Sequence, residues 1–282
     1  MNRAVFKTAS VLMALLLSTG LWLGAAPGSF QLAADETSTE INRINGRYFG
    51  KLAIDFGKVI TSPLRWKGKD IGLAIASGAG TLLFFAVDHG IRQWVEKHNA
   101  ANSSDFSLLA SKLGEGPFLL GLMTSLYLGG EAFHNDGLRK TAMLSLESYA
   151  ISGVIVTGLK FIFGRHRPLA GHGPLDFNFF SIKSHEHSFP SGHSVAAFSV
   201  ASVIAGQSDS AVVGALCYGL ASLVALSRVN NNEHWASDVV AGSLLGYFIG
   251  KAVLSFHRPS SKDKPTLGFA LAPGGVSLAL RF

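Results

Sequence analysis

Three short clusters of basic and nucleophilic side chains stand out in this sequence, and each lies at one end of an apolar segment. In chain order they are Lys160 with Arg167-Pro168, then Pro190-Ser191-Gly192-His193, and finally Ser227-Arg228 with His234 and Asp238. If successive apolar segments run antiparallel, the three clusters meet at one end of a helical bundle. We therefore predict that they form a single site.

The first property of such a site is affinity for an anion. Lys160, Arg167 and Arg228 would bring three positive charges together, and the planar fork of an arginine matches two oxygens of a phosphate group. Ser191-Gly192 would open a helix after Pro190, where free N–H groups and the positive end of the helix dipole face an anion. The pattern predicts a site for a dianionic or trianionic phosphate group.

The second property is reactivity. His234 and Asp238 are four residues apart, so on a helix they share a face, and the carboxylate can hold the proton of one ring nitrogen while the other nitrogen attacks. His193 comes from a different segment and could protonate the leaving oxygen on the far side of the phosphorus. We predict that His234 is the nucleophile, Asp238 its orienting partner and His193 the general acid.

Each residue also has a structural explanation when it is taken alone. Lys160 and Arg228 could be side chains that extend towards water from the ends of apolar segments, and His193 or His234 could be a capping or core histidine. Ser191-Gly192 could be an ordinary helix start. The ordered set Lys-x6-Arg-Pro, Pro-Ser-Gly-His and Ser-Arg-x5-His-x3-Asp, with fixed spacing inside each part, favours a site.

This ordered triplet resembles the three-part signature of the type-2 phosphatidic acid phosphatase superfamily, which also contains bacterial acid phosphatases and vanadium haloperoxidases. The motifs cover Lys160 to Asp238, and every position of the signature is met. The resemblance implies an all-helical bundle and metal-free hydrolysis of a phosphate ester through a phosphohistidine. It also implies that the residues named above bind phosphate and react.

Further polar side chains lie between the first two motifs or inside the apolar segments. Four histidines, which are His166, His172, His185 and His187, crowd the loop before Pro190. The pair His185-x-His187 would suit a metal, but no matching carboxylate or cysteine spacing accompanies it. We therefore expect no metal and no cofactor, and we expect these histidines to shape the substrate entrance. Arg165 could join the phosphate-binding cations, and Glu147 should be paired or face the bundle interior.

The elements that position these residues are helical. Six apolar segments follow one another: Ile71 to Val87, Pro117 to Gly130, Thr141 to Phe163, Ser191 to Ala205, Ala211 to Leu226 and Val239 to Phe256. They are rich in Gly, Ala and Ser, which suits close helix packing. Several are short for a bilayer span, which needs about 20 apolar residues. We predict an all-α fold with a six-helix core bundle as one domain over residues 71–256.

Two segments precede this domain and one follows it. Residues 1–34 have the layout of a signal peptide, or of an uncleaved anchor, with Arg3 and Lys7 before an apolar run. Residues 35–70 should form an amphipathic helix and a connector, with an apolar stripe that packs on the core or lies on a bilayer surface. In the tail, residues 257–282, alternating residues around Pro273-Gly274-Gly275 predict a β-hairpin. It would pack on the bundle or pair with another chain.

Composition favours a membrane and an anionic partner. Only 15% of the residues are charged and 48% are hydrophobic, against roughly a quarter charged in an ordinary soluble domain. The net charge of +6 favours anions, but no basic recognition helix, zinc finger or aromatic RNA-binding pattern indicates nucleic acid. Cys217 stands alone in the sequence and is expected to be a buried small hydrophobe.

Two signals about topology conflict. If all six segments span, the excess of Lys and Arg on one side puts the site outside the cytoplasm. An export signal before residue 40 would instead leave the site inside. We resolve this by predicting that the first apolar run is an export signal and that not every later segment crosses the bilayer. The site would then face the periplasm of a bacterial cell envelope.

Together these features predict a phosphatase that acts on a phosphate monoester or pyrophosphate of a membrane lipid. Candidate substrates are phosphatidic acid, phosphatidylglycerol phosphate, undecaprenyl pyrophosphate and the lipid A phosphates. A nonspecific acid phosphatase on soluble esters is the first alternative, and a vanadium-dependent haloperoxidase is the second. A catalytically silent membrane scaffold would need a broken triplet, and this one is intact.

Overall fold

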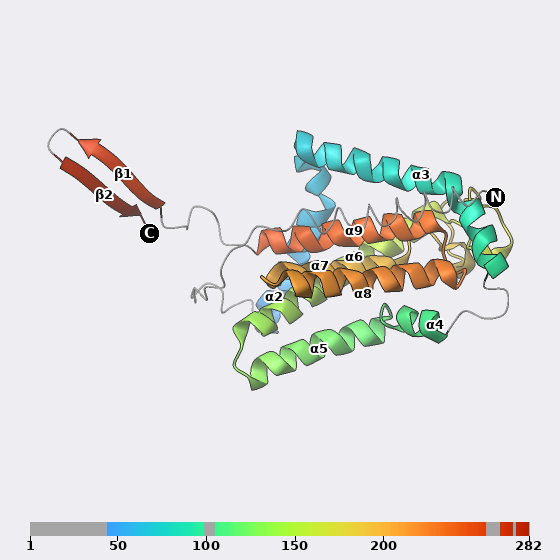
Figure 1. Cartoon of the computed structure of the whole chain (residues 1–282), viewed down its shortest axis with the longest axis horizontal. Coiled ribbons are helices and arrows are strands. Elements are labelled where there is room, and N and C mark those ends of the chain that lie inside the picture. The colour runs from blue at the N-terminus through green and yellow to red at the C-terminus, as the bar shows by residue number, and fades with distance from the viewer. Residues whose placement is uncertain (1–43, 99–104, 258–265, 273–274, 282) are drawn as a thin grey trace.

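A computed structural model describes residues 44–98, 105–257, 266–272 and 275–281 of the 282-residue chain. The predicted export segment, residues 1–34, lies outside the described residues, as do the first residues of the predicted amphipathic segment. The described part is a bundle of long helices followed by two short strands, shown in Figure 1.

The helices account for all six apolar segments. They are α2 (Gly46–Ile60), α3 (Gly68–His98), α4 (Asp105–Lys112), α5 (Gly116–Ala132), α6 (Asp136–Phe163), α7 (Gly192–Gln207), α8 (Ala211–Asn230) and α9 (Ala236–Phe256). The predicted segments fall in α3 and in α5 to α9, except that Ser191 is the N-cap of α7. Short 3₁₀ turns lie at η2 (Ser62–Arg65), η3 (Pro168–Ala170) and η4 (Ser184–Glu186). The all-α class predicted for residues 71–256 is confirmed.

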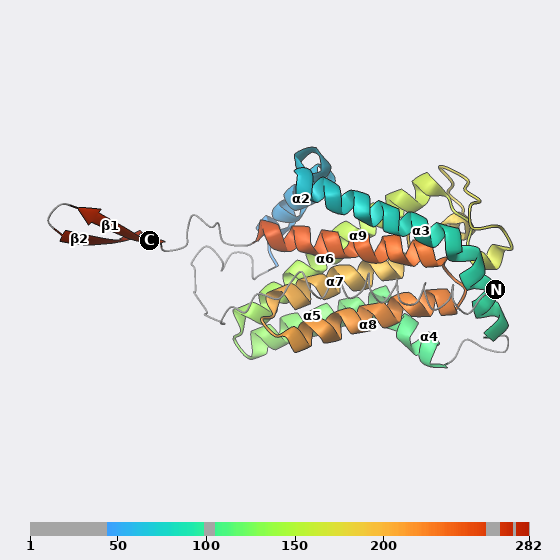
Figure 2. The same cartoon turned by 45° about the horizontal axis from the view of Figure 1, so that its top comes forward.

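Helix α7 lies in the middle of the bundle and packs against α6, α8 and α9 (Figure 2). Its contact with α9 is close because α9 presents a row of glycines four residues apart. A Cβ atom at Gly246 would lie 2.3 Å from the carbonyl oxygen of Val195, and one at Gly250 would lie 2.6 Å from that of Ser199. Small residues at this spacing let two helix backbones approach. This approach fixes the first turn of α7 beside the first turn of α9, where the second and third motifs lie.

Helix α6 delivers the first motif and then stops sharply. The side chain of Asn135 caps its start by accepting the N–H of Leu138 at 3.0 Å. At its end Gly164 adopts a left-handed conformation with φ 55°, which costs a residue with a Cβ about 1–2 kcal/mol. A Cβ there would also overlap the carbonyl group of Asn178. Gly164 therefore turns the chain out of α6 and into the loop that carries Arg165 and Arg167.

Helix α2 packs on the core, which is one of the two arrangements considered for the predicted amphipathic segment. Tyr48 and Val59 are buried, and Leu52 and Phe56 pack against the cluster that contains Leu144. The Tyr48 hydroxyl donates to the carbonyl oxygen of Met143 at 3.1 Å. Other apolar side chains of α2 remain exposed, so this helix has a second apolar surface.

The described helices include four that are long and apolar enough to cross a bilayer: α3, α6, α8 and α9. Helix α3 leaves most of its apolar side chains uncovered; Ile75 and Leu82 are each 67% exposed. Helices α5 and α7 have 17 and 16 residues, which at about 1.5 Å per residue falls short of a hydrocarbon core of about 30 Å. Length and apolar surface indicate a membrane protein.

The two strands pair with each other. Strand β1 (Thr266–Ala272) runs antiparallel to β2 (Gly275–Arg281), with Thr266 opposite Arg281 and Ala272 opposite Gly275. In Figure 1 they follow α9 at the end of the bundle remote from the α8–α9 turn. Both strands lie in the tail, for which the sequence predicts a β-hairpin. The packing of this strand pair on the bundle or against another chain stays a prediction.

Candidate phosphate-binding site

The three motifs meet at one end of the bundle, as the antiparallel arrangement requires. Figure 2 shows the loop between α6 and α7 at the same end as the turn between α8 and α9. The N–H of Ser191 donates to the carbonyl oxygen of Asp238 at 3.0 Å, which joins the second motif to the third. The Nζ atom of Lys160 donates to the carbonyl oxygen of His187 at 2.5 Å, which joins the first motif to the residues just before the second.

His234 is buried in the turn between α8 and α9. Its Nδ1 atom lies 3.5 Å from Oδ2 of Asp238 and 3.4 Å from the hydroxyl of Ser188. The Ser188 hydroxyl also donates to Oδ2 of Asp238 at 2.5 Å. His234 therefore has its Nδ1 side against Asp238 and Ser188, which leaves Nε2 as the nitrogen for an incoming group.

The predicted pairing of His234 with Asp238 is present, but the helix-face argument behind it is wrong. Helix α9 begins at Ala236, so His234 precedes the helix and Asp238 lies in its first turn. The Asp238 carboxylate accepts the N–H of Trp235 at 2.9 Å. A capping arrangement, and not a shared helical face, brings the two residues together.

Arg165 has a different place from the one expected, because it does not join the phosphate-binding cations. It is completely buried, and its guanidinium donates to Asp238 and, at 2.8 Å, to Oδ2 of Asp88 in α3. It also donates to the Ser237 hydroxyl at 2.7 Å and lies over the ring of Phe85 at 4.3 Å. Arg165 thus holds the carboxylate that orients His234. The sequence did contain a sign of this role. Asp88 is a carboxylate beside an apolar segment, and such a carboxylate requires a cationic partner such as Arg165.

Three cations line the other side of the site, and we call Lys160, Arg167 and Arg228 the phosphate cradle. Arg167 donates to Oε2 of Glu233 at 2.5 Å, and Nη2 of Arg228 lies 3.5 Å from the same oxygen. Arg228 also donates to the hydroxyl of Ser111 in α4. The Nε atoms of both arginines are buried without a hydrogen-bond partner. The cradle therefore has donors free for an anion.

The cradle acts electrostatically on both histidines. Burial, and then the positive charges of Lys160 and Arg167, lower the pKa of His234 to about 3, although its hydrogen bond to Asp238 opposes this. Burial, and then Arg228, Lys160 and Arg167, lower the pKa of His193 to about 4. Both imidazoles are therefore neutral near pH 7 beside these cations. A bound phosphate dianion would offset the cationic charge and raise both pKa values.

The second motif supplies the start of α7. Ser191 is the N-cap and is fully buried, and its hydroxyl accepts a hydrogen bond from Ser194 at 3.1 Å. Gly192 lies against Lys160, because a Cβ there would be 3.6 Å from the Lys160 Cε atom. His193 and Gly192 line one part of a cavity of about 370 Å³ between α5, α6 and α7. The structure therefore brings together all eight residues predicted for the site.

Sequence reasoning missed three residues of this site. Ser188 precedes the second motif, Ser111 belongs to α4, and Glu233 precedes the nucleophile candidate. Ser and Glu are common in loops, and no spacing marks these positions. The remaining loop histidines are near the site but outside the cradle: the Nε2 atom of His187 bonds the carbonyl oxygen of Ser181 at 2.8 Å.

Comparisons with known proteins agree with the family that the three motifs indicate. The family model described as the PAP2 superfamily matches residues 141–262, the segment that contains all three motifs. This segment therefore resembles the PAP2 superfamily, and the helical fold of the chain is consistent with that resemblance. The resemblance to the type-2 phosphatidic acid phosphatase superfamily is therefore confirmed.

Two of the similar proteins carry the names of lipid phosphatases. The lipid A 1-phosphatase of Porphyromonas gingivalis is 30% identical over 177 residues, which cover 61% of this chain and 35% of that relative. A transmembrane PAP2-type phosphatidylglycerolphosphate phosphatase from Bacillus subtilis has a similar fold, with a TM-score of 0.50 and 23% identity over 64% of this chain and 94% of that one. LpxE of Aquifex aeolicus gives a TM-score of 0.46 at 23% identity, over 58% of this chain and 93% of that one. The chain spans about a third of the length of the curated relative.

Glu233 should compete with phosphate for the cradle. The change Glu233→Gln removes a carboxylate that the two cradle arginines share, so inorganic phosphate should bind more tightly. Because Glu233 is about one-third exposed, the gain should be modest, about 2- to 5-fold. Isothermal titration of the purified protein with phosphate measures it. Glu131→Gln, which removes a carboxylate from the ion pair with Arg139, is the control and should change nothing. Weaker phosphate binding by Glu233→Gln would contradict this role.

Proposed function

We propose that this chain is a membrane phosphatase that removes phosphate from a phosphate monoester or pyrophosphate of a membrane lipid, through a phosphohistidine on His234. The observation that carries the proposal is the placement of a buried histidine, fixed through Nδ1 by Asp238 and Ser188, next to an arginine- and lysine-lined cradle. A neutral imidazole with one nitrogen held and the other free is a nucleophile.

Binding begins at the cradle. The phosphoryl oxygens take the place of the Glu233 carboxylate on Arg167 and Arg228 and meet Lys160 from the side of α6. The N–H groups at the start of α7, after Ser191 and Gly192, add donors. Positioning and charge stabilisation supply most of the rate enhancement in phosphoryl transfer.

The chemistry then proceeds in two displacements. The Nε2 atom of His234 attacks phosphorus, an N–P bond forms, and the bond from phosphorus to the leaving oxygen breaks as His193 donates a proton to that oxygen. Asp238 stabilises the positive charge that develops on the His234 ring. In the second step His193 accepts a proton from water, the water oxygen attacks phosphorus, and the N–P bond breaks to release inorganic phosphate.

The bound phosphate also explains how His193 can act as an acid. Burial and the three cradle cations lower the pKa of His193 to about 4. A dianion in the cradle offsets the charges of Lys160, Arg167 and Arg228 and brings the pKa of His193 closer to that of an ordinary imidazole. Substrate binding therefore favours the protonated acid.

A lipid substrate is supported by the cavity beside His193. Its wall includes the apolar residues Pro117, Val156, Val195 and Ala196 beside polar residues such as Tyr149. A lipid tail could lie there with its phosphate in the cradle. Phosphatidic acid, phosphatidylglycerol phosphate, undecaprenyl pyrophosphate and the lipid A phosphates all carry this combination, and the names of the relatives fit the class.

The site should face the periplasm of a bacterial envelope, a proposal supported by the charge distribution and the predicted export segment. Leu175, in the loop between the first two motifs, is 71% exposed. In a Cys217→Ala background, Leu175→Cys should react with a membrane-impermeant maleimide in intact cells without permeabilisation of the inner membrane. Labelling only after permeabilisation would place the site in the cytoplasm.

Phosphate release from a panel of lipid phosphates and p-nitrophenyl phosphate tests the activity. The wild type should prefer a lipid phosphate, and His234→Ala should lose at least about 1000-fold in kcat/KM because the nucleophile is gone. His89→Ala, which changes an exposed histidine of α3, should leave the rate unchanged. Activity that persists in His234→Ala would refute the mechanism. Equal rates on the soluble ester would indicate a nonspecific acid phosphatase instead.

A further inference from the structure

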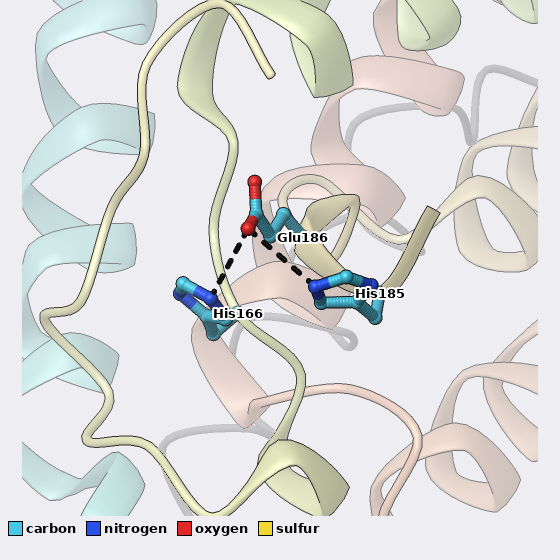
Figure 3. Close-up of side chains that lie close together, drawn as sticks. All are labelled: His166, His185 and Glu186. Carbon is cyan, nitrogen blue, oxygen red and sulfur yellow. Dashed lines mark ion pairs between the residues drawn. The ribbon is translucent and has the colours of Figure 1, made fainter. Parts of the chain in front are cut away.

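A second group of side chains converges just outside the phosphate cradle. His166 lies between Arg165 and Arg167, while His185 and Glu186 belong to the 3₁₀ turn η4. Figure 3 shows the two imidazoles on either side of the Glu186 carboxylate, with one oxygen facing a ring nitrogen of each. Oε1 of Glu186 lies 3.6 Å from Nε2 of His166 and 3.5 Å from Nε2 of His185. All three ligand atoms lie within 4.8 Å of one another.

These distances suit a shared metal ion better than hydrogen bonds. A hydrogen bond between nitrogen and oxygen is about 2.7–3.2 Å long. Two ligand atoms about 2.1 Å from one Zn²⁺ ion in tetrahedral geometry are about 3.4 Å apart. The separations from Oε1 of Glu186 to both imidazoles are close to this value.

The surroundings of Glu186 fix the direction of its carboxylate. Its other oxygen, Oε2, accepts hydrogen bonds from Asn178 at 2.9 Å and from the Ser181 hydroxyl. Oε1 is thereby turned towards the two histidines. Hydrogen-bonded carboxylates of this kind are typical of metal sites, where partners orient the ligand.

His166 provides independent support. Its side chain is buried, and its Nδ1 atom has no hydrogen-bond partner, although most buried polar groups in proteins have one. Nδ1 lies 3.7 Å from Oδ1 of Asp176. A histidine that binds metal through Nε2 usually donates its other N–H to a carboxylate. Asp176 is placed to accept that bond.

The other candidate groups in the described residues fit a metal less well. His166 and His172 are stacked, with ring centroids 4.0 Å apart and an interplanar angle of 17°, so the lone pairs of the two rings run parallel and do not converge. At another place in the bundle Asp55 and Glu147 face His257, and Lys58 pairs with Asp55. A lysine therefore already pairs with one of these two carboxylates.

We propose that His166, His185 and Glu186 form a Zn²⁺ site, with water completing the coordination. Two imidazoles and one carboxylate are ligands that zinc accepts and that calcium and magnesium do not favour. Lys183, whose Nζ lies 3.6 Å from Oε1 of Glu186 and whose side chain is 61% exposed, turns to solvent when the metal binds.

The metal would act on the cradle through the backbone. The N–H of Arg167 donates to the carbonyl oxygen of His185 at 3.3 Å, and the N–H of Ser188 donates to that of Arg165 at 2.9 Å. A Zn²⁺ ion between residue 166 and residues 185–186 therefore cross-links the two ends of the loop. It fixes the loop that positions Arg167 and Ser188 and lies outside the phosphoryl-transfer chemistry.

Metal binding itself is the test, so the result does not depend on the proposed activity. The full chain, purified in detergent without a polyhistidine tag and stripped with EDTA, is titrated with Co²⁺ and followed by visible absorption, and Zn²⁺ is measured by competition. The wild type should bind one equivalent. Glu186→Gln and His185→Ala should each weaken binding at least about 10-fold. Lys183→Ala should tighten it, because a competing cation is removed.

His187→Ala is the matched control. It removes a histidine of the same loop whose Nε2 already bonds the carbonyl oxygen of Ser181, so it should bind metal as the wild type does. His185 is largely exposed, with 62% of its side chain accessible, so His185→Ala should fold. The absence of binding by the wild type, binding by His185→Ala equal to that of the wild type, or an equal loss in His187→Ala would each overturn the proposal.

Discussion

The buried Asp238 carboxylate is the interaction on which the rest of this structure depends. An isolated buried charge costs several kcal/mol, and here it is offset by Arg165, by the Ser188 hydroxyl, by the Trp235 N–H and by the nearby His234 ring. Arg165 and Ser188 come from the α6–α7 loop, and His234 and Trp235 come from the α8–α9 turn. The charge therefore holds the α6–α7 loop, the α8–α9 turn and α9 in one arrangement, and Arg165 extends it to Asp88 in α3.

The phosphate cradle differs from the Asp238 cluster, because its three charges have the same sign and repel one another. Lys160, Arg167 and Arg228 are brought together by three different segments, and Glu233 and Ser111 meet only part of their demand for partners. The buried Nε atoms of both arginines remain without a hydrogen bond. A phosphate group satisfies these donors and balances their charge. An anion in the cradle therefore offsets the repulsion among its three cations.

Much of this arrangement could be predicted from the sequence. Ordered motifs at the ends of apolar segments led to eight candidate site residues that lie at one end of the bundle, and hydrophobic runs located α3 and α5 to α9. Side-chain direction could not be predicted in the same way. Arg165 follows Gly164, whose left-handed conformation turns the chain so that Arg165 points to Asp88 and Asp238, while Arg167 points to Glu233.

The proposed metal ligand Glu186 was also missed, although it lies between His185 and His187. The spacing of the sequence shows neither that Glu186 is buried nor that the distant His166 lies beside it. Short α4 and its Ser111 carried no periodic signal.

The phosphohistidine is the central claim, and trapping it is the most direct measurement. The purified protein would be mixed with a lipid phosphate labelled with ³²P, quenched under alkaline conditions that preserve phosphohistidine, and digested for mass spectrometry. The account predicts a phosphorylated peptide that contains His234, and its absence from His234→Ala. Label on another residue, or turnover without any labelled protein under conditions that trap the intermediate, would contradict it.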